Sequence, residues 1–447
     1  MPPFDAKALH SRFQKAIDDG VAPGVQYTVF DRDSTLLSDA IGYARVSATG
    51  EKEVKMTTNT FCWLASCSKL SISLIVLHVL ERGLAKDGSS LADLDSSLAL
   101  LRVLPEFDPK SDTYVSKILT GWGSIDPATG KLTPQLTPRK TIPTIRQMLL
   151  HTAGLAYQWS SSNGLQKWYA PSPGEGVPQA DMPYVKGDIA DLNAPSVREA
   201  GEDWEYSPSL DWMAIWLQRV TGKSCRQLHR EILFEPLGIV DKIDTYVDDR
   251  PDEEKAAIHV RNPEGKLVSI PFAVWSCPDL PPKGKFNFGT AMLHGSHQAL
   301  AATFQACMRR DERILSASTW ALALADHPGS VKASLPSPLL ESMIPAVVTS
   351  MKELNPGSTN VPSLLSTFRN CTTTTSGKPA GSQTWLGLAN SYFAFNEEAN
   401  IGYAYGCSTF PCASEEFVRL REDVERIVFG QGKGQGKAQM NGCRVQE

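Results

Sequence analysis

The strongest constraint on the fold of this 447-residue chain is that strand-type sequence occurs near both of its ends. The segment at 24–44, GVQYTVFDRDSTLLSDAIGYA, alternates apolar and polar residues around a turn at 31–34, which predicts a β-hairpin. The segment at 384–409, TWLGLANSYFAFNEEANIGYAYGCST, repeats this design around a turn at 396–400. We therefore predict an α+β fold, in which a central antiparallel sheet is built from both termini and flanked by helices, with a mostly helical lobe inserted in the middle.

This organisation predicts a single domain over residues 1–430, although the length alone would allow about three. Residues 1–60 and 270–430 are expected to form an α/β lobe, and residues 61–269 the helical lobe. Residues 431–447 are of low complexity and are predicted to be a flexible tail.

Two segments, 105–140 and 156–198, are rich in Pro, Gly and Ser, and we predict that they are long loops of the kind that often covers a functional site. Aromatic residues in or after the second segment are candidates for the wall of an apolar pocket, with ordinary core packing as the other interpretation. They are Trp159, Trp168, Tyr169, Trp204, Trp212 and Trp216. The last two are one helical turn apart, which favours the core for them.

Charge and hydropathy exclude several classes of protein. The net charge of −5 is spread along the chain without a basic block, so nucleic acid is not an expected partner. The N-terminus lacks the apolar region of a secretory signal, and the most apolar run, LSISLIVLHVL at 70–80, is too short to cross a bilayer. We expect a soluble, cytoplasmic protein without membrane contact.

The nine cysteines are scattered and odd in number, which fits free thiols in a reducing compartment better than a disulfide framework. Four residues separate Cys62 from Cys67, and four separate Cys407 from Cys412, a spacing that metal sites also use. The histidines are dispersed, however, so no metal or other cofactor is expected.

Ser66 and Lys69 are the first candidates for chemistry. They lie three residues apart in FCWLASCSKLSIS (61–73), at the start of an apolar stretch that ends at Gly83 and predicts a buried helix. Residues three apart share a helical face, so the lysine amine can reach the serine hydroxyl, and the helix N-terminus offers N–H groups to a developing oxyanion. The alternative is a capping serine beside a surface lysine.

Tyr206, in WEYSPSLDW (204–212), is the second candidate. A serine hydroxyl needs a base, and an ordinary lysine is protonated at neutral pH. A tyrosine held beside the Lys69 cation would have its phenolate favoured, and the two groups would then pass a proton to and from Ser66. The alternative is a half-buried aromatic residue without a chemical role.

The order of these motifs resembles the serine β-lactamase and penicillin-binding-protein superfamily. The motifs are Ser66-x-x-Lys69, MLLHTAGL at 148–155, Tyr206-Ser207-Pro208 and Trp385-Leu386-Gly387. Within it, the chain looks like the class C-type esterases, and most like the fungal acyltransferases related to the lovastatin side-chain transesterase, over about residues 20–430.

The resemblance implies a role for each matching residue. Ser66 would be the acylated nucleophile, with Lys69 and Tyr206 as general base and acid. The backbone N–H of Ser66 and that of Gly387 or Leu388 would form the oxyanion hole, and Trp385 would line the acyl pocket.

Three departures from the superfamily pattern bear on the substrate. Pro208 stands where β-lactamases have an asparagine, and Trp385 stands where they have a lysine for an anionic substrate group. Both argue against penicillins and cephalosporins as substrates. The segment 289–308 matches the glycine-rich turn and helix of the superfamily only loosely.

The implied reaction is acyl transfer through an acyl-Ser66 intermediate. We predict a transacylase that takes its acyl group from a thioester or ester, with a carrier protein as a candidate partner, and passes it to a hydroxyl of a small natural-product molecule. A carboxylesterase, in which water is the acceptor, and a non-catalytic ligand-binding relative are the alternatives.

Overall fold

The structure is a computed structural model that describes residues 4–430 apart from 158–159, 161, 170–185, 290, 326, 328–359 and 413. Trp159 and the predicted flexible tail at 431–447 lie outside the described residues.

The strands are β1 Gly24–Phe30, β2 Thr35–Val46, β3 Lys52–Lys55, β4 Cys62–Trp63, β5 Lys117–Ile125, β6 Leu132–Pro138, β7 Ile243–Asp244, β8 Ile258–Arg261, β9 Leu267–Ile270, β10 His294–Gly295, β11 Asn360–Pro362, β12 Phe368–Asn370, β13 Gln383–Gly387, β14 Ser391–Asn396 and β15 Ile401–Gly406. The α-helices are α1 Ala6–Asp18, α2 Lys69–Glu81, α3 Ser97–Val103, α4 Ile145–Leu149, α5 Gln166–Tyr169, α7 Ser209–Thr221, α8 Cys225–His229, α9 Glu235–Leu237, α10 His297–Arg309, α11 Ala317–Leu324 and α14 Glu415–Phe429.

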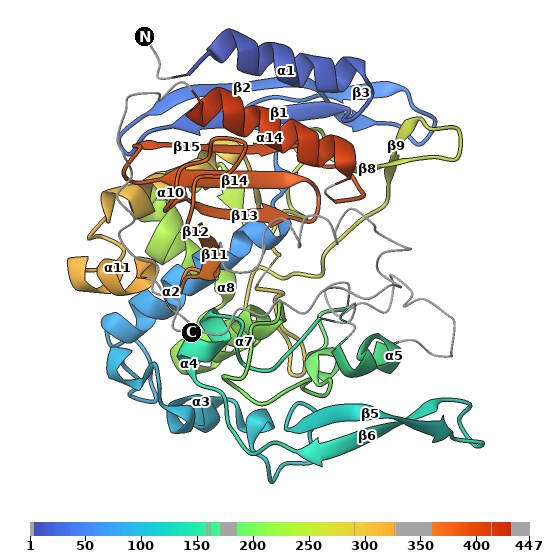
Figure 1. Ribbon diagram of the computed structural model, residues 1–447, viewed down its shortest axis with the longest axis vertical. Coiled ribbons are helices and arrows are strands. Elements are labelled where there is room, and N and C mark those ends of the chain that lie inside the picture. The colour runs from blue at the N-terminus through green and yellow to red at the C-terminus, as the bar shows by residue number, and fades with distance from the viewer. Residues whose placement is uncertain are drawn as a thin grey trace.

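The main sheet, as far as the chain is described, has eight antiparallel strands in the order β11-β12-β13-β14-β15-β1-β2-β3 (Figure 1). Strand β1 pairs with β15, which places Tyr27 opposite Tyr405. The two ends of the chain therefore meet in the middle of one sheet, and the predicted fold class is confirmed.

Alternate side chains of the central strands face two different layers, as the pleat of a strand requires. Tyr392 of β14 belongs to the core beneath α1 and α14, which lie together over one face of the sheet (Figure 1). Its neighbour Phe393 belongs to the larger core on the other face, where the ring of Phe304 on α10 stacks on it with centroids 4.1 Å apart. The central strands β1, β14 and β15 are buried on both faces, so this part of the sheet is an inner layer.

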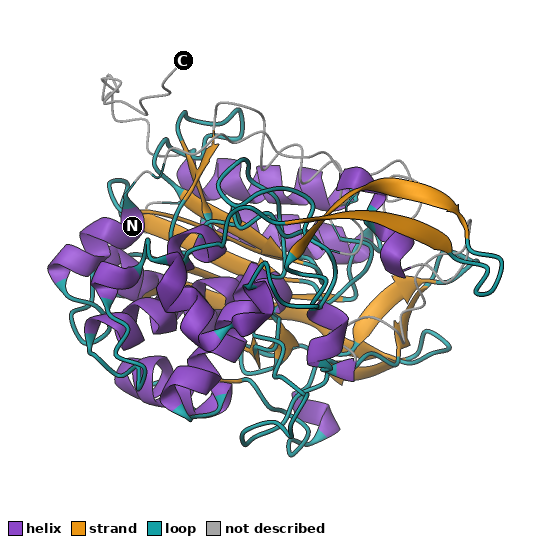
Figure 2. Ribbon diagram, turned by 90° about the horizontal axis from the view of Figure 1, so that it is seen from below, coloured by secondary structure: helices purple, strands orange, loops and turns teal. Residues whose placement is uncertain are grey.

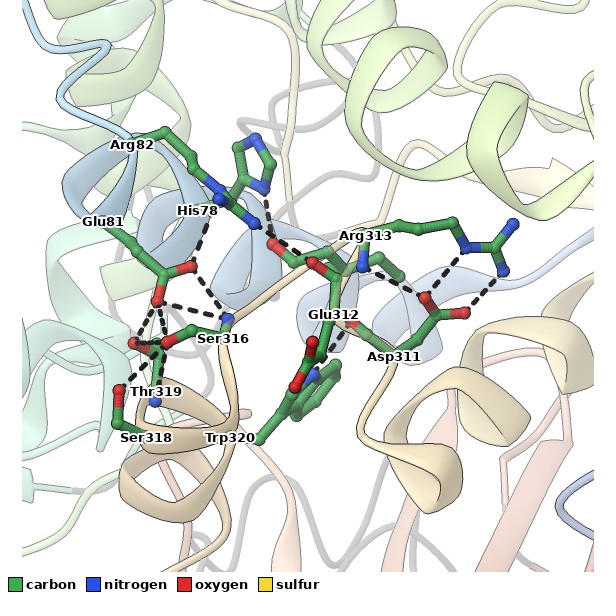
Figure 3. A network of polar contacts seen from close by, with 11 residues as sticks. His78, Glu81, Arg82, Asp311, Glu312, Arg313, Ser316, Ser318, Thr319 and Trp320 are labelled. Carbon is green, nitrogen blue, oxygen red and sulfur yellow. Dashed lines mark hydrogen bonds and ion pairs between the residues drawn. The ribbon is translucent and has the colours of Figure 1, made fainter.

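Helix α2 crosses beneath the sheet and packs against α7, and its side chains are buried in nearly every direction. Figure 3 shows how its C-terminal end is fixed. The Glu81 carboxylate accepts hydrogen bonds from the backbone N–H of Ser316 at 3.0 and 3.2 Å and from Thr319 Oγ1 at 2.5 Å. These bonds tie the C-terminal end of α2, the helix that follows Ser66, to the first turn of α11.

One predicted loop is wrong. Within 105–140, strands β5 and β6 form a two-stranded antiparallel ribbon that projects from the body (Figures 1 and 2). Its prolines, Pro134 and Pro138, are typical of loops, but a two-stranded ribbon leaves one edge of each strand unpaired, where a residue without an N–H is tolerated. The composition of the segment concealed its strands.

The structure bears on the cysteines and on metal binding only within the described residues. All eight cysteines in the described ranges are free thiols. No group of three or more His, Cys, Asp or Glu side chains in these ranges is arranged to hold a metal ion. The helices of the described part of the chain are all too short or too polar to cross a membrane.

Candidate active site

Ser66 lies on a tight turn between β4 and α2. It is the second residue of a 3₁₀ helix, Ala65–Ser68, that continues directly into α2. Ala65 has φ of 46°, in the left-handed region that residues with a side chain rarely adopt. A hydrogen bond also anchors the turn, since the backbone N–H of Leu293 donates to Ser68 Oγ at 3.2 Å. The sequence thus places the candidate nucleophile on a strained and anchored turn.

The end of β13 lies directly against this turn. A Cβ atom added at Gly387 would lie 2.4 Å from the carbonyl oxygen of Leu64 and 3.3 Å from the Cβ of Ala65. Only a residue without a side chain allows so close an approach. The structure therefore brings Gly387, with its neighbour Leu388, next to the backbone of Ser66, where the resemblance implied an oxyanion hole.

Two side chains, one from the next helical turn and one from a distant part of the chain, meet at the Ser66 hydroxyl. Lys69 Nζ donates to Ser66 Oγ at 3.0 Å, and the phenol of Tyr206 donates to the same oxygen at 2.6 Å. Since Tyr206 lies 140 residues further along the chain, this contact depends on the tertiary fold.

Lys69 is almost completely buried, with 1% of its surface exposed. Burial lowers its pKa to about 7, although Asp211, and after it Cys67, act in the opposite direction. The rings of Tyr206 and Tyr157 lie close to the amine, with centroids 4.8 and 5.5 Å from Nζ. A substantial fraction of the amine is therefore neutral at pH 7 and able to accept a proton.

Tyr206 differs from the sequence-based expectation. Burial raises the pKa of its phenol above the usual value, and Asp211 raises it further, while the hydrogen bond with Ser66 and the nearby Trp385 indole lower it. The effect of burial is the largest, so the resting residue is a protonated phenol. The prediction that the Lys69 cation would favour a phenolate is wrong for the resting protein, because burial of the phenol outweighs the groups that lower its pKa.

Aromatic rings enclose Tyr206. The ring of Trp385 lies 5.2 Å from it and that of Trp204 lies 6.4 Å from it, nearly parallel, while Phe368 packs between these two indoles. Trp385 is 4% exposed, and its indole is close enough to the Tyr206 phenol to lower the pKa of that group.

The other aromatic candidates lie elsewhere. Trp212 and Trp216 are fully buried in the main core, as their helical spacing predicted. Trp168 and Tyr169 pack with Leu119 of β5 in a separate small cluster.

Sequence reasoning gave no role to two buried groups beside the site. The ring of His151 lies 5.2 Å from that of Tyr206, and its Nδ1 is hydrogen-bonded to Ser207 Oγ at 3.1 Å. Burial, and then the charge of Lys69, hold the pKa of His151 well below its usual value, so the imidazole is neutral. The motif HTAGL contains His151 and could have indicated it. The second group, Asp211, is buried in α7, and no sequence motif marks it.

Two of the sequence departures have a clear structural setting. The carbonyl of Pro208 accepts a hydrogen bond from the N–H of Trp212 at 3.2 Å, so this proline begins α7. The segment 289–308 supplies β10 and α10. A Cβ at Gly289 would lie 2.3 Å from the Cβ of Ala214, which shows how closely this segment passes α7.

This arrangement can activate a hydroxyl. Ser66 Oγ accepts two hydrogen bonds, from a lysine that is partly neutral and from a phenol that keeps its proton. A neutral amine can take the serine proton, and a phenol can give one to a leaving group, so one site holds a base and an acid at neutral pH.

Comparison with curated proteins finds several fungal relatives. The chain is 25% identical to the acyltransferase mokF of Monascus pilosus, over 70% of this chain and 69% of that one. It is 27% identical to a lovastatin esterase of Penicillium rubens and 28% identical to a monacolin J acid methylbutanoyltransferase of Aspergillus terreus. The alignment with the esterase covers 52% of this chain and 51% of that protein. The alignment with the methylbutanoyltransferase covers 55% of this chain and 52% of that protein, so this chain matches about half of each relative.

Solved structures agree on the fold. Unliganded simvastatin synthase (LovD) from Aspergillus terreus matches with a TM-score of 0.71 at 21% identity, over 97% of this chain and 100% of that one. EstCE1, a hydrolase with promiscuous acyltransferase activity, matches with a TM-score of 0.65 at 20% identity, over 95% of this chain and 98% of that one. The family model described as Beta-lactamase matches residues 9–425, and the chain belongs to this family.

Proposed function

We propose that this protein is a serine acyltransferase that moves an acyl group from a thioester or ester donor, through an acyl-Ser66 intermediate, to a hydroxyl of a small natural-product molecule. The observation that carries the proposal is the pair of hydrogen bonds from Lys69 and Tyr206 to Ser66 Oγ. Relatives named as acyltransferases and methylbutanoyltransferases support this reaction class.

In the acylation step, neutral Lys69 takes the proton of Ser66 while Oγ attacks the acyl carbon. The negative charge that develops on the carbonyl oxygen is stabilised by the backbone N–H of Ser66 and that of Gly387 or Leu388. When the tetrahedral intermediate collapses, the phenol of Tyr206 gives its proton to the departing thiolate or alkoxide. The step leaves an ester on Ser66, an ammonium on Lys69 and a phenolate on Tyr206, which attract each other.

The transfer step runs in the opposite direction. The phenolate of Tyr206 takes the proton of the acceptor hydroxyl as its oxygen attacks the acyl carbon, and Lys69 returns a proton to Ser66 Oγ as the bond to the enzyme breaks. Proton balance is restored without an external acid or base. In this proposal Trp385 lines the acyl pocket and a carrier protein can present the donor.

Hydrolysis is the second candidate function. It uses the same first step with water as acceptor, and it is supported by the relatives named as esterases and by the hydrolase with promiscuous acyltransferase activity. The two functions differ in how well the site excludes water and positions an alcohol.

A fluorophosphonate probe tests whether Ser66 is the nucleophile. The wild-type protein should gain one probe mass, and Ser66→Ala should gain none. Ser318→Ala, a matched change at an exposed serine of α11, should label as the wild type does. Labelling that persists in Ser66→Ala would refute the proposed nucleophile, and an unlabelled wild-type protein would favour a non-catalytic ligand-binding relative.

A further inference from the structure

A buried acidic residue outside the proposed proton relay holds one wall of the site. Glu205 is 5% exposed and directly precedes Tyr206. Its carboxylate accepts hydrogen bonds from Ser160 Oγ at 2.5 Å and from Ser162 Oγ at 2.8 Å, and it forms an ion pair with Arg198 Nη2 at 2.5 Å. We call these four residues the Glu205 clamp.

The clamp is connected to Tyr157 through the backbone. The N–H of Ser160 donates to the carbonyl of Tyr157 at 2.9 Å, so the serine held by Glu205 also holds the end of the segment that carries Tyr157. The N–H of Tyr157 donates to the carbonyl of Tyr206 at 3.4 Å, and the N–H of Glu205 donates to the carbonyl of His151 at 2.9 Å. These contacts fix Tyr157 in relation to the Tyr206 backbone.

Tyr157 lies beside Lys69. Its ring lies 5.5 Å from Lys69 Nζ and 4.9 Å from the ring of Tyr206. Both side chains are buried, since Tyr157 is 5% exposed and Lys69 1% exposed.

We propose that Tyr157 is the cover that keeps water from the Lys69 amine, and that Glu205 is a positioning residue that holds this cover in place through Ser160 and Ser162. The inference rests on the proposed roles of Ser66 and Lys69. It adds a second set of residues, outside the proton relay itself, that sets the pH at which the site works.

The physical reason is the balance of forces on the lysine charge. Burial is the largest influence on Lys69 and lowers its pKa, so water admitted to the amine raises the pKa toward its ordinary value. The attraction between an ammonium and an aromatic ring acts in the opposite direction, and Tyr157→Ala removes that attraction as well. An upward shift of the midpoint in this variant therefore means that the loss of burial outweighs the loss of the ring. Among the described residues, the titratable groups that face Lys69 from the surrounding elements are Cys67, His151, Tyr157, Tyr206 and Asp211.

The test is the pH dependence of fluorophosphonate labelling. In the wild type, the rate should rise with pH around a midpoint near 7, as Lys69 loses its proton. Tyr157→Ala removes the cover, and the midpoint should move up by about one pH unit or more, so that labelling well below the midpoint falls about tenfold. Tyr157→Phe keeps the ring and should leave the midpoint where it is.

The double variant Ser160→Ala with Ser162→Ala tests the clamp. It keeps both partners of the Glu205–Arg198 ion pair and removes the hydrogen bonds that the two serine hydroxyls donate to Glu205. It also removes the bond that Ser162 Oγ accepts from Arg198 Nη2 and the one that Ser160 Oγ accepts from the Ser162 N–H, each 3.1 Å long. The variant is still less disruptive than a change at Glu205, which would leave Arg198 without this carboxylate. Its midpoint should also move up. A lower melting temperature with an unmoved midpoint in both this variant and Tyr157→Ala would show a purely structural role and overturn the inference.

Failure of the inference can be told apart from failure of the proposed function. Labelling that depends on Ser66, with a midpoint that no variant moves, overturns the role of the cover alone. Labelling that persists in Ser66→Ala refutes the proposed function and the inference with it.

Discussion

The substitution Gly387→Ala should slow acylation without unfolding the protein. The added Cβ would lie 2.4 Å from the carbonyl oxygen of Leu64, whereas ordinary contacts of this kind begin at 3.4 Å. Strand β13 and the Ser66 turn must therefore separate by about 1 Å, and a displacement of this size at a reacting centre can cost about a hundredfold in rate. Because both backbones carry proposed oxyanion donors, we expect labelling of Ser66 by a fluorophosphonate to slow by about that factor.

The assay compares labelling rates at a temperature well below the melting transition. Overpacking of this kind costs about 1–3 kcal/mol of stability, so a lower melting temperature is expected as well. Gly123→Ala is the matched control, because its Cβ would meet the nearest atom, the carbonyl oxygen of Thr133, at 3.5 Å. A Gly387→Ala protein that labels at the control rate would refute the reasoning that this strand end serves the reaction.

Three further changes test separate parts of the account. Tyr206→Phe should bind ligands but lose about a hundredfold or more in turnover, since it removes the acid that protonates the leaving group, and unchanged steady-state kinetics would remove the tyrosine from the mechanism. Asp211→Asn removes a charge that raises the pKa of Lys69, so the rising limb of the pH–rate profile should move to lower pH; a shift to higher pH would contradict this. Burial alone would raise the pKa of Glu425, but Lys378, 3.0 Å away, and the other partners of Glu425 outweigh it, so the pKa is lowered in the folded protein. The Glu425 carboxylate therefore stabilises the fold above its unfolded pKa, and this stabilisation is lost as the pH falls through its lower folded pKa. Glu425→Gln should therefore cost about 3–5 kcal/mol at pH 7 and less at acid pH, measured by denaturant unfolding, and an equal cost at both would be inconsistent with this linkage.

The sheet was predictable because its central strands carry their alternation in the sequence and belong to the two ends of the chain. The β5–β6 ribbon was not predictable, because its proline and glycine residues are typical of loops. Such residues are tolerated in strands that have an unpaired edge, as both strands of this ribbon do. The division into two lobes, the cytoplasmic location and a carrier-protein partner stay predictions.

At the site, spacing alone brought Ser66 and Lys69 together, since they share one helical turn. Tyr206 was named as a candidate partner of Lys69 and was supported by the resemblance, but its contact with Ser66 depends on the tertiary fold. The charge states were not accessible from sequence, because the pKa of Lys69 depends on burial by residues such as Tyr157 that lie far apart in the chain. Glu205 was missed for the same reason, since an acidic residue in a loop gives no sign of being buried.

The most direct test of the central claim is intact-protein mass spectrometry after incubation with a panel of acyl thioesters, followed by peptide mapping. We predict that one acyl group appears on the wild-type protein, that it maps to Ser66, and that it is released faster by a small alcohol acceptor than by water. An acyl group that maps to another residue, or a protein that takes up no acyl group while Ser66 remains intact, would contradict the account.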